Sequence, residues 1–138
     1  MTPLYSTSAR AVGGREGHVQ TPDGQVKLTL AMPPELGGKG GGANPEQLFA
    51  AGYAACFESA LRFVARQQKL PLKDAAVTAT VELHPRDGGF QLGVALAAEV
   101  SGLEQTAAEE LVEAAHKVCP YSHAVRGNID VRLTTTVQ

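Results

Sequence analysis

Two cysteines, Cys56 and Cys119, are the residues with the clearest capacity for chemistry, and the chain of 138 residues contains no others. Taken singly, Cys56 is better explained as a small buried hydrophobic residue and Cys119 as a packed residue at a helix end, because free cysteine packs readily in protein cores. Taken together they suggest a redox pair, in which one thiolate reacts and a second thiol resolves the oxidised product. They lie far apart in the sequence, so only the fold can bring them together.

The position of Cys119 suggests how the two roles divide. It closes the segment His116-Lys117-Val118-Cys119, where Pro120 ends an expected helix. A helix C-terminus disfavours negative charge, so Cys119 is the poorer thiolate and the better resolving thiol. Cys56 is then the candidate nucleophile, and it needs a cation from elsewhere to stabilise its thiolate.

Arg15 is the candidate cation, because it lies in a glycine-flanked turn from which it can project inward. A solvated turn arginine is the simpler explanation on composition alone. Arg62 and Arg66 follow Cys56 on the same expected helix, but neither is an i+3 or i+4 neighbour of it. Glu46 is the candidate anion that holds the arginine, and it equally suits the positive end of a helix dipole.

A metal site is the competing interpretation of the second cysteine region. His116, Cys119 and His123, with Cys56 as a fourth ligand, have spacings that resemble zinc ligands. The pattern is weak, because a second Cys-x-x-Cys motif is missing. The sequence also lacks a Gly-x-Ser-x-Gly motif and a dinucleotide-binding fingerprint.

A long helix from residue 45 to about residue 69 must position Cys56. Asn44 suits its N-cap, Pro45 its first turn and Glu46 its dipole, and Pro71 lies beyond its end. The first half is apolar on every side, which predicts a helix buried all round. Four small residues allow another backbone to approach it closely: Ala51, Gly52, Ala55 and Ser59.

The remaining periodicity predicts strands and one further helix. The expected strands are Leu4–Val12, His18–Gln20, Gln25–Leu30, Ala76–His84, Phe90–Val100 and Asn128–Val137. Pro22-Asp23-Gly24 and the segment 85–89 are the expected hairpin turns. Thr106–Val118 is an amphipathic helix with Leu111, Ala114, Ala115 and Val118 on one stripe. This order predicts one α+β domain over residues 1–138 with mostly antiparallel sheet.

Composition excludes several classes of partner. The net charge of −2 gives no electrostatic basis for binding nucleic acid or an anionic membrane. The N-terminus carries no signal-peptide pattern, and no stretch is expected to span a bilayer. We therefore expect a cytoplasmic protein, in which two cysteines are more often chemical than structural.

Three separated motifs resemble the organic hydroperoxide resistance proteins, the Ohr branch of the OsmC/Ohr family. The segment Asn44–Phe57 resembles the core helix of that branch, and Val118–Ser122 with Arg126-Gly127-Asn128 resembles its second cysteine motif. Gly13–His18 resembles its arginine turn, and Leu4–Thr7 also fits. The resemblance covers essentially the whole chain.

The resemblance implies a thiol-dependent peroxidase with no metal and no bound cofactor. By position, Cys56 matches the peroxidatic cysteine, Cys119 the resolving cysteine, and Arg15 and Glu46 the pair that activates the thiolate. It also implies an OsmC/Ohr-like fold in an intertwined homodimer, with sheets wrapped around a long buried helix. The implied substrates are organic hydroperoxides, including those of fatty acids, and the implied reductant is a lipoylated protein or dihydrolipoamide.

Further expectations concern the site's surroundings. An apolar wall of Leu36, Phe49 and Phe57 would favour alkyl peroxides. If Glu46 and Cys56 share a helix they are separated by about 15 Å along its axis, so Glu46 is expected to serve the other subunit's site. Whether Arg15 acts in cis or in trans stays open. A redox sensor without turnover and a zinc protein are the alternatives, although no DNA-binding element supports the sensor.

Overall fold

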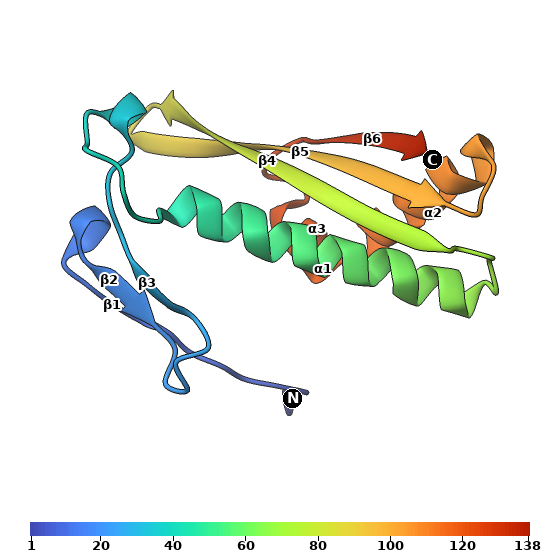
Figure 1. The fold of residues 1–138 in the computed structure, drawn as a ribbon, viewed down its shortest axis with the longest axis horizontal. Coiled ribbons are helices and arrows are strands. Elements are labelled where there is room, and N and C mark those ends of the chain that lie inside the picture. The colour runs from blue at the N-terminus through green and yellow to red at the C-terminus, as the bar shows by residue number, and fades with distance from the viewer. The chain divides into compact units, whose positions relative to one another are not determined.

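The computed structural model describes all residues from Met1 to Gln138, which form two compact units, residues 1–48 and 49–138. Each unit is described by itself. The elements follow the order β1-β2-β3-α1-β4-β5-α2-α3-β6, with two short 3-10 turns at Gly14–Glu16 and Pro34–Leu36 (Figure 1). The expectation of a single domain over residues 1–138 stays a prediction.

The first unit contains a small antiparallel sheet of three short strands. These strands are β1 (Arg10–Val12), β2 (His18–Gln20) and β3 (Lys27–Thr29). The predicted first strand from residue 4 is shortened, because Arg10 pairs with Gln20 and the chain turns at Thr21. No partner strand remains for the residues before Arg10. The predicted turn around Asp23 is confirmed, with Gly24 at a positive φ of 75°.

Helix α1 spans Pro45–Gln67, close to the predicted range. Asn44 caps it reciprocally with Gln47: each backbone N–H donates to the other residue's side-chain oxygen, at 3.2 and 2.9 Å. Satisfying these free donors fixes the helix start one residue before Glu46.

The prediction that α1 is buried on every side is wrong for the single chain. One stripe is buried in the core, formed by Tyr53, Phe57, Ala60, Leu61, Val64 and Ala65. The small residues Ala51, Ala55 and Ser59, one helical turn apart, are exposed. An apolar helix therefore has one narrow face that the chain itself leaves uncovered.

The expectation that no stretch could span a bilayer also needs correction. By length and composition α1 qualifies, with 23 residues and a mean hydropathy of 1.3 in its most apolar window. A core helix of a globular protein passes the same test, and a third of that window is buried within this chain. The observation is therefore weak support for a membrane location.

The second unit is built on the sheet β4-β5-β6, comprising Asp74–Arg86, Gly89–Ser101 and Val131–Val137. Strands β4 and β5 form a long antiparallel hairpin whose turn is only Asp87-Gly88, shorter than the predicted loop. The predicted alternation is confirmed over most of both strands: on β5, Val94, Leu96, Ala98 and Val100 are buried, and on β4, Val77, Ala79 and Val81 pack against the core. Phe90, predicted on the same face of β5, is exposed instead.

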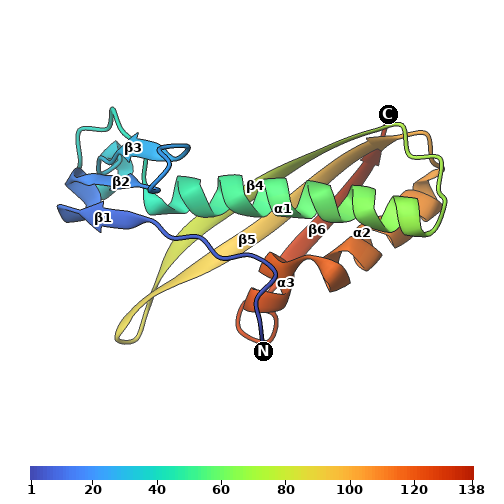
Figure 2. The same ribbon diagram turned by 90° about the horizontal axis from the view of Figure 1, so that it is seen from below.

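Two helices connect β5 to β6, which pair in parallel. They are α2 (Gln105–Val118) and α3 (Pro120–Val125), and Figures 1 and 2 show both on the same face of the sheet as α1. The predicted stripe on α2 is shifted: Ala108, Leu111, Val112 and Ala115 are buried, whereas Val118 is exposed.

The predicted α+β class with mostly antiparallel sheet is confirmed. Helix α3 was not predicted. Its signal was Pro120, a residue that ends one helix but is also favoured in the first turn of the next.

Candidate active site

The turn that carries Arg15 depends on glycine at its closing position. A side chain at Gly17 would place its Cβ only 1.7 Å from the carbonyl oxygen of Val12. Gly13 precedes the turn with a φ of 86°, in the left-handed region that glycine tolerates. The backbone N–H of Gly17 donates to the carbonyl of Gly14 and closes the turn around Arg15.

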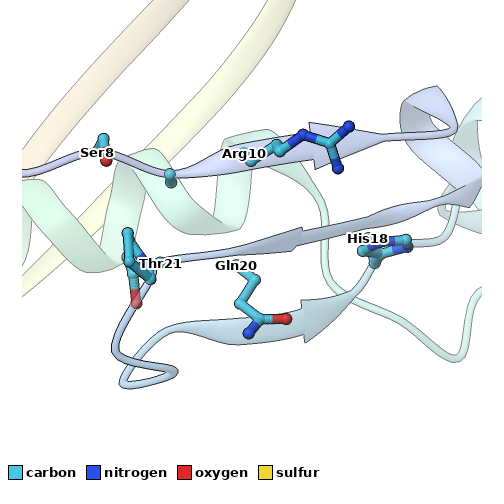
Figure 3. Close-up of a pocket in the computed structure, with 7 residues that line it drawn as sticks. Ser8, Arg10, His18, Gln20 and Thr21 are labelled. Carbon is cyan, nitrogen blue, oxygen red and sulfur yellow. The ribbon is translucent and has the colours of Figure 1, made fainter.

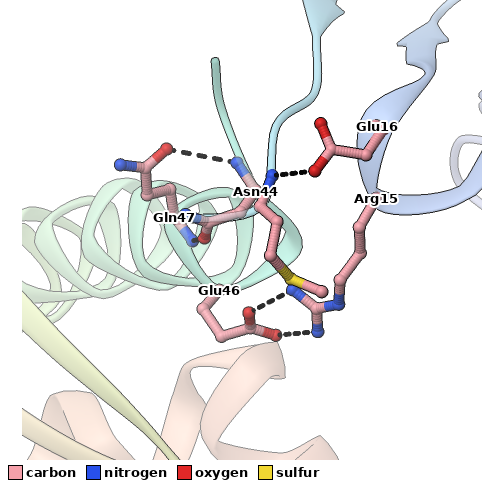
Figure 4. A network of polar contacts seen from close by, with 6 residues as sticks. Arg15, Glu16, Asn44, Glu46 and Gln47 are labelled. Carbon is pink, nitrogen blue, oxygen red and sulfur yellow. Dashed lines mark hydrogen bonds and ion pairs between the residues drawn. The ribbon is translucent and has the colours of Figure 1, made fainter. Parts of the chain in front are cut away.

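Arg15 and Glu46 form a two-pronged ion pair, as Figure 4 shows. Nη1 donates to Oε1 at 2.7 Å and Nη2 donates to Oε2 at 3.0 Å. The guanidinium lowers the pKa of the Glu46 carboxyl, chiefly through these hydrogen bonds, and Glu46 raises the pKa of Arg15. Both groups are charged at neutral pH, and the predicted pairing of Arg15 with Glu46 is present.

A neighbouring contact, missed in the sequence, fixes the turn further. Glu16 accepts the backbone N–H of Met32 at 3.1 Å, so the residue beside Arg15 ties the turn to the chain segment before α1 (Figure 4). The guanidinium is therefore presented by an anchored backbone and oriented by a carboxylate, which suits the recognition of an anion.

Cys56 and Cys119 meet within the second unit. Both are free thiols, and their sulfur atoms are 3.7 Å apart, with the Cys119 thiol directed at Cys56. Cys56 comes from the middle of α1 and Cys119 from the junction of α2 and α3. A disulfide needs about 2.05 Å between its sulfur atoms, so only a small shift separates this pair from a covalent bond.

The electrostatics of Cys56 are unfavourable for a thiolate within this unit. Burial raises the pKa of the Cys56 thiol, the adjacent Cys119 raises it further, and the backbone N–H of Tyr121 partly opposes both. These effects disfavour a thiolate at Cys56 within this unit, and a cation beside the sulfur would oppose them.

The surroundings of Cys119 differ from the predicted helix end. Cys119 is completely buried, and it closes α2 while also preceding the first turn of α3. Its backbone N–H donates to Ala115 and its carbonyl accepts from His123, so both helices fix its backbone. Cys119 therefore does not lie at a simple helix C-terminus, because a second helix begins at the same residue.

Two of the rival residues, Arg62 and His116, have other partners. Arg62 pairs with Glu58 one turn earlier on α1. No group of three or more histidine, cysteine, aspartate or glutamate side chains comes together to hold a metal ion. His116, a possible zinc ligand in the sequence, instead bonds the hydroxyl of Ser122 at 2.8 Å.

Aromatic rings pack beside the sulfur pair. The ring centroids of Phe49 and Tyr53 each lie about 6 Å from that of Tyr121, at 6.2 and 5.7 Å. Gly52 permits this packing, because a Cβ there would lie 2.6 Å from the Tyr121 hydroxyl. Gly52 therefore leaves room for the Tyr121 side chain, whereas the sequence had suggested the close approach of another backbone.

The predicted apolar wall is only partly available. Phe57 is completely buried in the core, and Leu36 is exposed in the first unit. Phe49 lines a pocket of about 290 Å³ in the second unit. Its other lining residues are Arg86, Phe90, Gln91, Leu92, Val125, Asn128 and Ile129.

A larger pocket, of about 580 Å³, lies in the first unit (Figure 3). It is lined by Arg10, His18 and Gln20 of β1 and β2 and by residues flanking these strands. None of the four predicted site residues lines this pocket. Its size alone therefore does not identify it as the active site.

The fold and the sequence match one family. The family model described as OsmC-like protein matches residues 38–134. The chain belongs to the OsmC/Ohr family, in the branch of the organic hydroperoxide resistance proteins.

Individual relatives cover nearly the full chain. An organic hydroperoxide resistance protein from Legionella pneumophila is 60% identical, with a TM-score of 0.96 over 99% of this chain and 100% of that one. A putative one from Vibrio cholerae, with captopril bound in one of its active sites, is 55% identical, with a TM-score of 0.93 over 98% and 94%. The organic hydroperoxide resistance protein of Xanthomonas axonopodis pv. citri is 50% identical over 95% of this chain and 94% of its own.

Proposed function

We propose that this protein is a thiol-dependent peroxidase that reduces organic hydroperoxides to alcohols. The observation that carries the proposal is the approach of two free cysteine sulfurs to 3.7 Å. The names of the relatives from Legionella and Xanthomonas, which refer to organic hydroperoxide resistance, support the substrate class.

The proposed cycle begins at Cys56. Its thiolate attacks the distal oxygen of the hydroperoxide, the O–O bond breaks, and the alkoxide leaves as an alcohol after taking up a proton. Cys56 becomes a sulfenic acid. The Cys119 sulfur then displaces hydroxide from it, which leaves with the Cys119 proton as water, and a disulfide forms. A dithiol restores both thiols by exchange and is itself oxidised to a disulfide.

Arg15 and Glu46 are proposed to activate Cys56. The guanidinium would stabilise the thiolate and the negative charge that develops on the leaving oxygen. Glu46 would hold the guanidinium in the orientation that its two hydrogen bonds define. This role is consistent with the raised pKa of the Cys56 thiol, which an added cation would lower.

We place Glu46 in the site of a second subunit. Glu46 and Cys56 both belong to α1, and ten residues of helix separate them by about 15 Å along the axis, beyond the reach of a glutamate side chain. The exposed face of Ala51, Ala55 and Ser59 would let two copies of α1 pack closely in a homodimer. The same contact would cover a face that is otherwise exposed to water.

The substrate and reductant follow from the same chemistry. The pocket beside Phe49, with apolar lining from Phe90, Leu92, Val125 and Ile129, suits an alkyl chain. Dihydrolipoamide or a lipoylated protein is the proposed dithiol, and the cytoplasm the proposed location, where such dithiols are kept reduced.

A steady-state assay with cumene hydroperoxide and dihydrolipoamide tests the function. Wild type should turn over, and Cys56→Ser should lose all activity because serine is a poor nucleophile at neutral pH. Cys119→Ser should consume one equivalent of peroxide and stop as a sulfenic acid, detectable by mass spectrometry. A wild-type disulfide that forms but is not reduced by the dithiol would indicate a sensor instead.

A further inference from the structure

A chain of three hydrogen-bonded side chains lies beside the cysteine pair. The hydroxyl of Tyr53 is 2.7 Å from that of Ser122, and the same Ser122 oxygen is 2.8 Å from Nδ1 of His116. Tyr53 and Ser122 are completely buried. Three elements meet in this chain, because Tyr53 belongs to α1, His116 to α2 and Ser122 to α3.

Each member lies three residues from a sulfur-bearing residue. Tyr53 precedes Cys56 by three positions on α1, and His116 and Ser122 flank Cys119 at equal distance on either side. Three residues along a helix is close to one turn, so each group lies near the backbone that holds a sulfur. Burial raises the pKa of the Tyr53 phenol, and both cysteines add to the increase.

The number of hydroxyl hydrogens determines which group donates in each of the two hydrogen bonds. Tyr53 and Ser122 have one hydroxyl hydrogen each, and every buried side-chain polar atom has a hydrogen-bond partner. Both hydrogens are used only when Tyr53 donates to Ser122 and Ser122 donates to Nδ1 of His116. That arrangement requires a neutral imidazole with its proton on Nε2, since a protonated Nδ1 would leave one buried hydroxyl hydrogen without an acceptor.

The charges around His116 agree with the neutral form. Burial lowers the pKa of the imidazole most, the Arg126 guanidinium lowers it further, and Glu113 on the same helix opposes them. Arg126 also donates to the carbonyl oxygen of His116, so the cation is fixed beside it. The Phe57 ring of α1, at a centroid distance of 6.5 Å, is apolar and supplies no compensating charge.

We propose that the Tyr53–Ser122–His116 chain is a positioning element that ties the α2–α3 junction to α1 and thereby holds Cys119 within reach of Cys56. In this proposal the three side chains act through the position of Cys119 and not by contact with the peroxide. Their effect is on the second step, in which the Cys119 sulfur gives an electron pair to the sulfur of the Cys56 sulfenic acid and water departs. The proposal rests on the proposed function for its biological use, but the geometry of the thiol pair is testable without peroxide.

The test measures how readily the Cys56–Cys119 disulfide forms in the folded protein. Reduced and oxidised dithiothreitol set the redox poise, and alkylation followed by mass spectrometry counts the thiols. Ser122→Ala and Tyr53→Phe should each lower the effective concentration of the two thiols about tenfold, because each removes the link between the elements. The double variant should be no worse than the worse single variant, since one lost bond already breaks the chain.

The pH profile separates positioning from a loss of folding. The wild-type effective concentration should fall as the pH is lowered through the pKa of His116, which lies below the ordinary histidine value, because a protonated Nδ1 can no longer accept the Ser122 hydroxyl. His116→Gln and Ser122→Ala should not show this fall in effective concentration at low pH. His123→Gln, an exposed histidine of α3, is the matched control and should keep it. Tyr53→Phe preserves the ring and its packing, so it still reports if Ser122→Ala is unstable.

The outcomes distinguish this inference from the peroxidase proposal. If Tyr53→Phe and Ser122→Ala stay folded and form the disulfide within twofold of wild type, with an unchanged pH profile, the positioning role is overturned. If the variants behave as expected but wild type reduces no organic hydroperoxide, the proposed function fails and the positioning element stands.

Discussion

The two regions that carry the candidate site are chemically opposite. In residues 1–48, Arg15 and Glu46 form a matched, partly exposed ion pair with both hydrogen bonds satisfied. In residues 49–138, Cys56 and Cys119 form a sulfur pair among apolar groups, and burial raises the pKa of Cys56. One region has charge without a nucleophile, and the other has a nucleophile whose charged form is disfavoured.

That contrast has a physical reason. A thiolate gains most from a cation where water is excluded, since the interaction is stronger at a low effective dielectric constant. A guanidinium, however, is costly to bury unless a carboxylate accompanies it. Separating the ion pair from the thiols along the chain lets each be stable in its own surroundings, and the proposed second subunit would bring them together.

The largest expected effect comes from dividing the two pairs between subunits. Glu46→Ala and Cys56→Ser proteins, each inactive or severely impaired, should regain activity when they exchange subunits, up to about half of wild type in the mixed dimer. One site then has both intact pairs and the other has neither. Peroxide turnover after mixing at subunit-exchange equilibrium is the measurement.

The control takes the Cys56→Ser protein alone through the same subunit exchange. All its sites lack Cys56, so it should stay inactive. If the Glu46→Ala and Cys56→Ser mixture also stays inactive although mass spectrometry shows mixed dimers, Glu46 acts within its own subunit and the shared site is wrong.

Removing the cation should affect the first step alone. Arg15→Ala should raise the Cys56 pKa and slow oxidation by peroxide on the order of 10²–10³-fold, as expected for a lost electrostatic stabiliser. Arg15→Lys should recover only part, because an ammonium lacks the planar fork that matches Glu46. Alkylation of Cys56 as a function of pH reports the pKa directly.

Arg62→Ala is the matched control for this variant, since Arg62 pairs with Glu58 instead. An Arg15→Ala protein with the wild-type alkylation profile would remove Arg15 from the site.

A smaller effect is expected from filling the space at Gly52. Gly52→Ala forces the Tyr121 hydroxyl to move and should lower the free energy of unfolding by about 1–3 kcal/mol, the usual cost of overpacking. Adding Tyr121→Phe removes the nearest atom and should restore part of the loss. Urea denaturation measures both.

Gly89→Ala provides the comparison, because a Cβ there meets no atom within 4 Å. Equal destabilisation of the two glycine variants would show that helix or strand propensity, and not the contact with Tyr121, determines the result.

The smallest effect concerns the ion pair itself. Because Arg15 lowers the pKa of Glu46, the pair stabilises the fold above the ordinary carboxyl pKa, and this contribution is lost as the pH falls through the lowered value. A partly exposed pair should contribute less than about 1 kcal/mol. The urea midpoints of wild type and Glu46→Gln should therefore differ at pH 7 and converge as the pH falls below the ordinary carboxyl range.

Glu35→Gln changes an exposed carboxylate in the same unit and should shift the midpoint little at any of these pH values. A Glu46→Gln difference that persists unchanged at low pH would show that the ion pair is not its source.

The sequence alone determined the elements whose signals are local. Asn44-Pro45-Glu46 specified a helix start, strict alternation specified β4 and β5, and glycines marked the turn that carries Arg15, because caps, periodicity and backbone freedom depend on neighbouring residues. It also singled out Cys56, Cys119, Arg15 and Glu46, whose types limit the chemistry they can support. Family resemblance, rather than spacing, joined them into one mechanism.

Tertiary structure decided what depends on distant contacts. The approach of Cys56 to Cys119 and the pairing of Arg15 with Glu46 join residues far apart in the chain, and no local pattern encodes such distances. The same holds for Tyr53, Ser122 and His116, whose side chains are unremarkable one by one and become a directed chain only when three helices meet. Burial, which sets their protonation, is likewise a property of the packed molecule and not of the sequence read residue by residue.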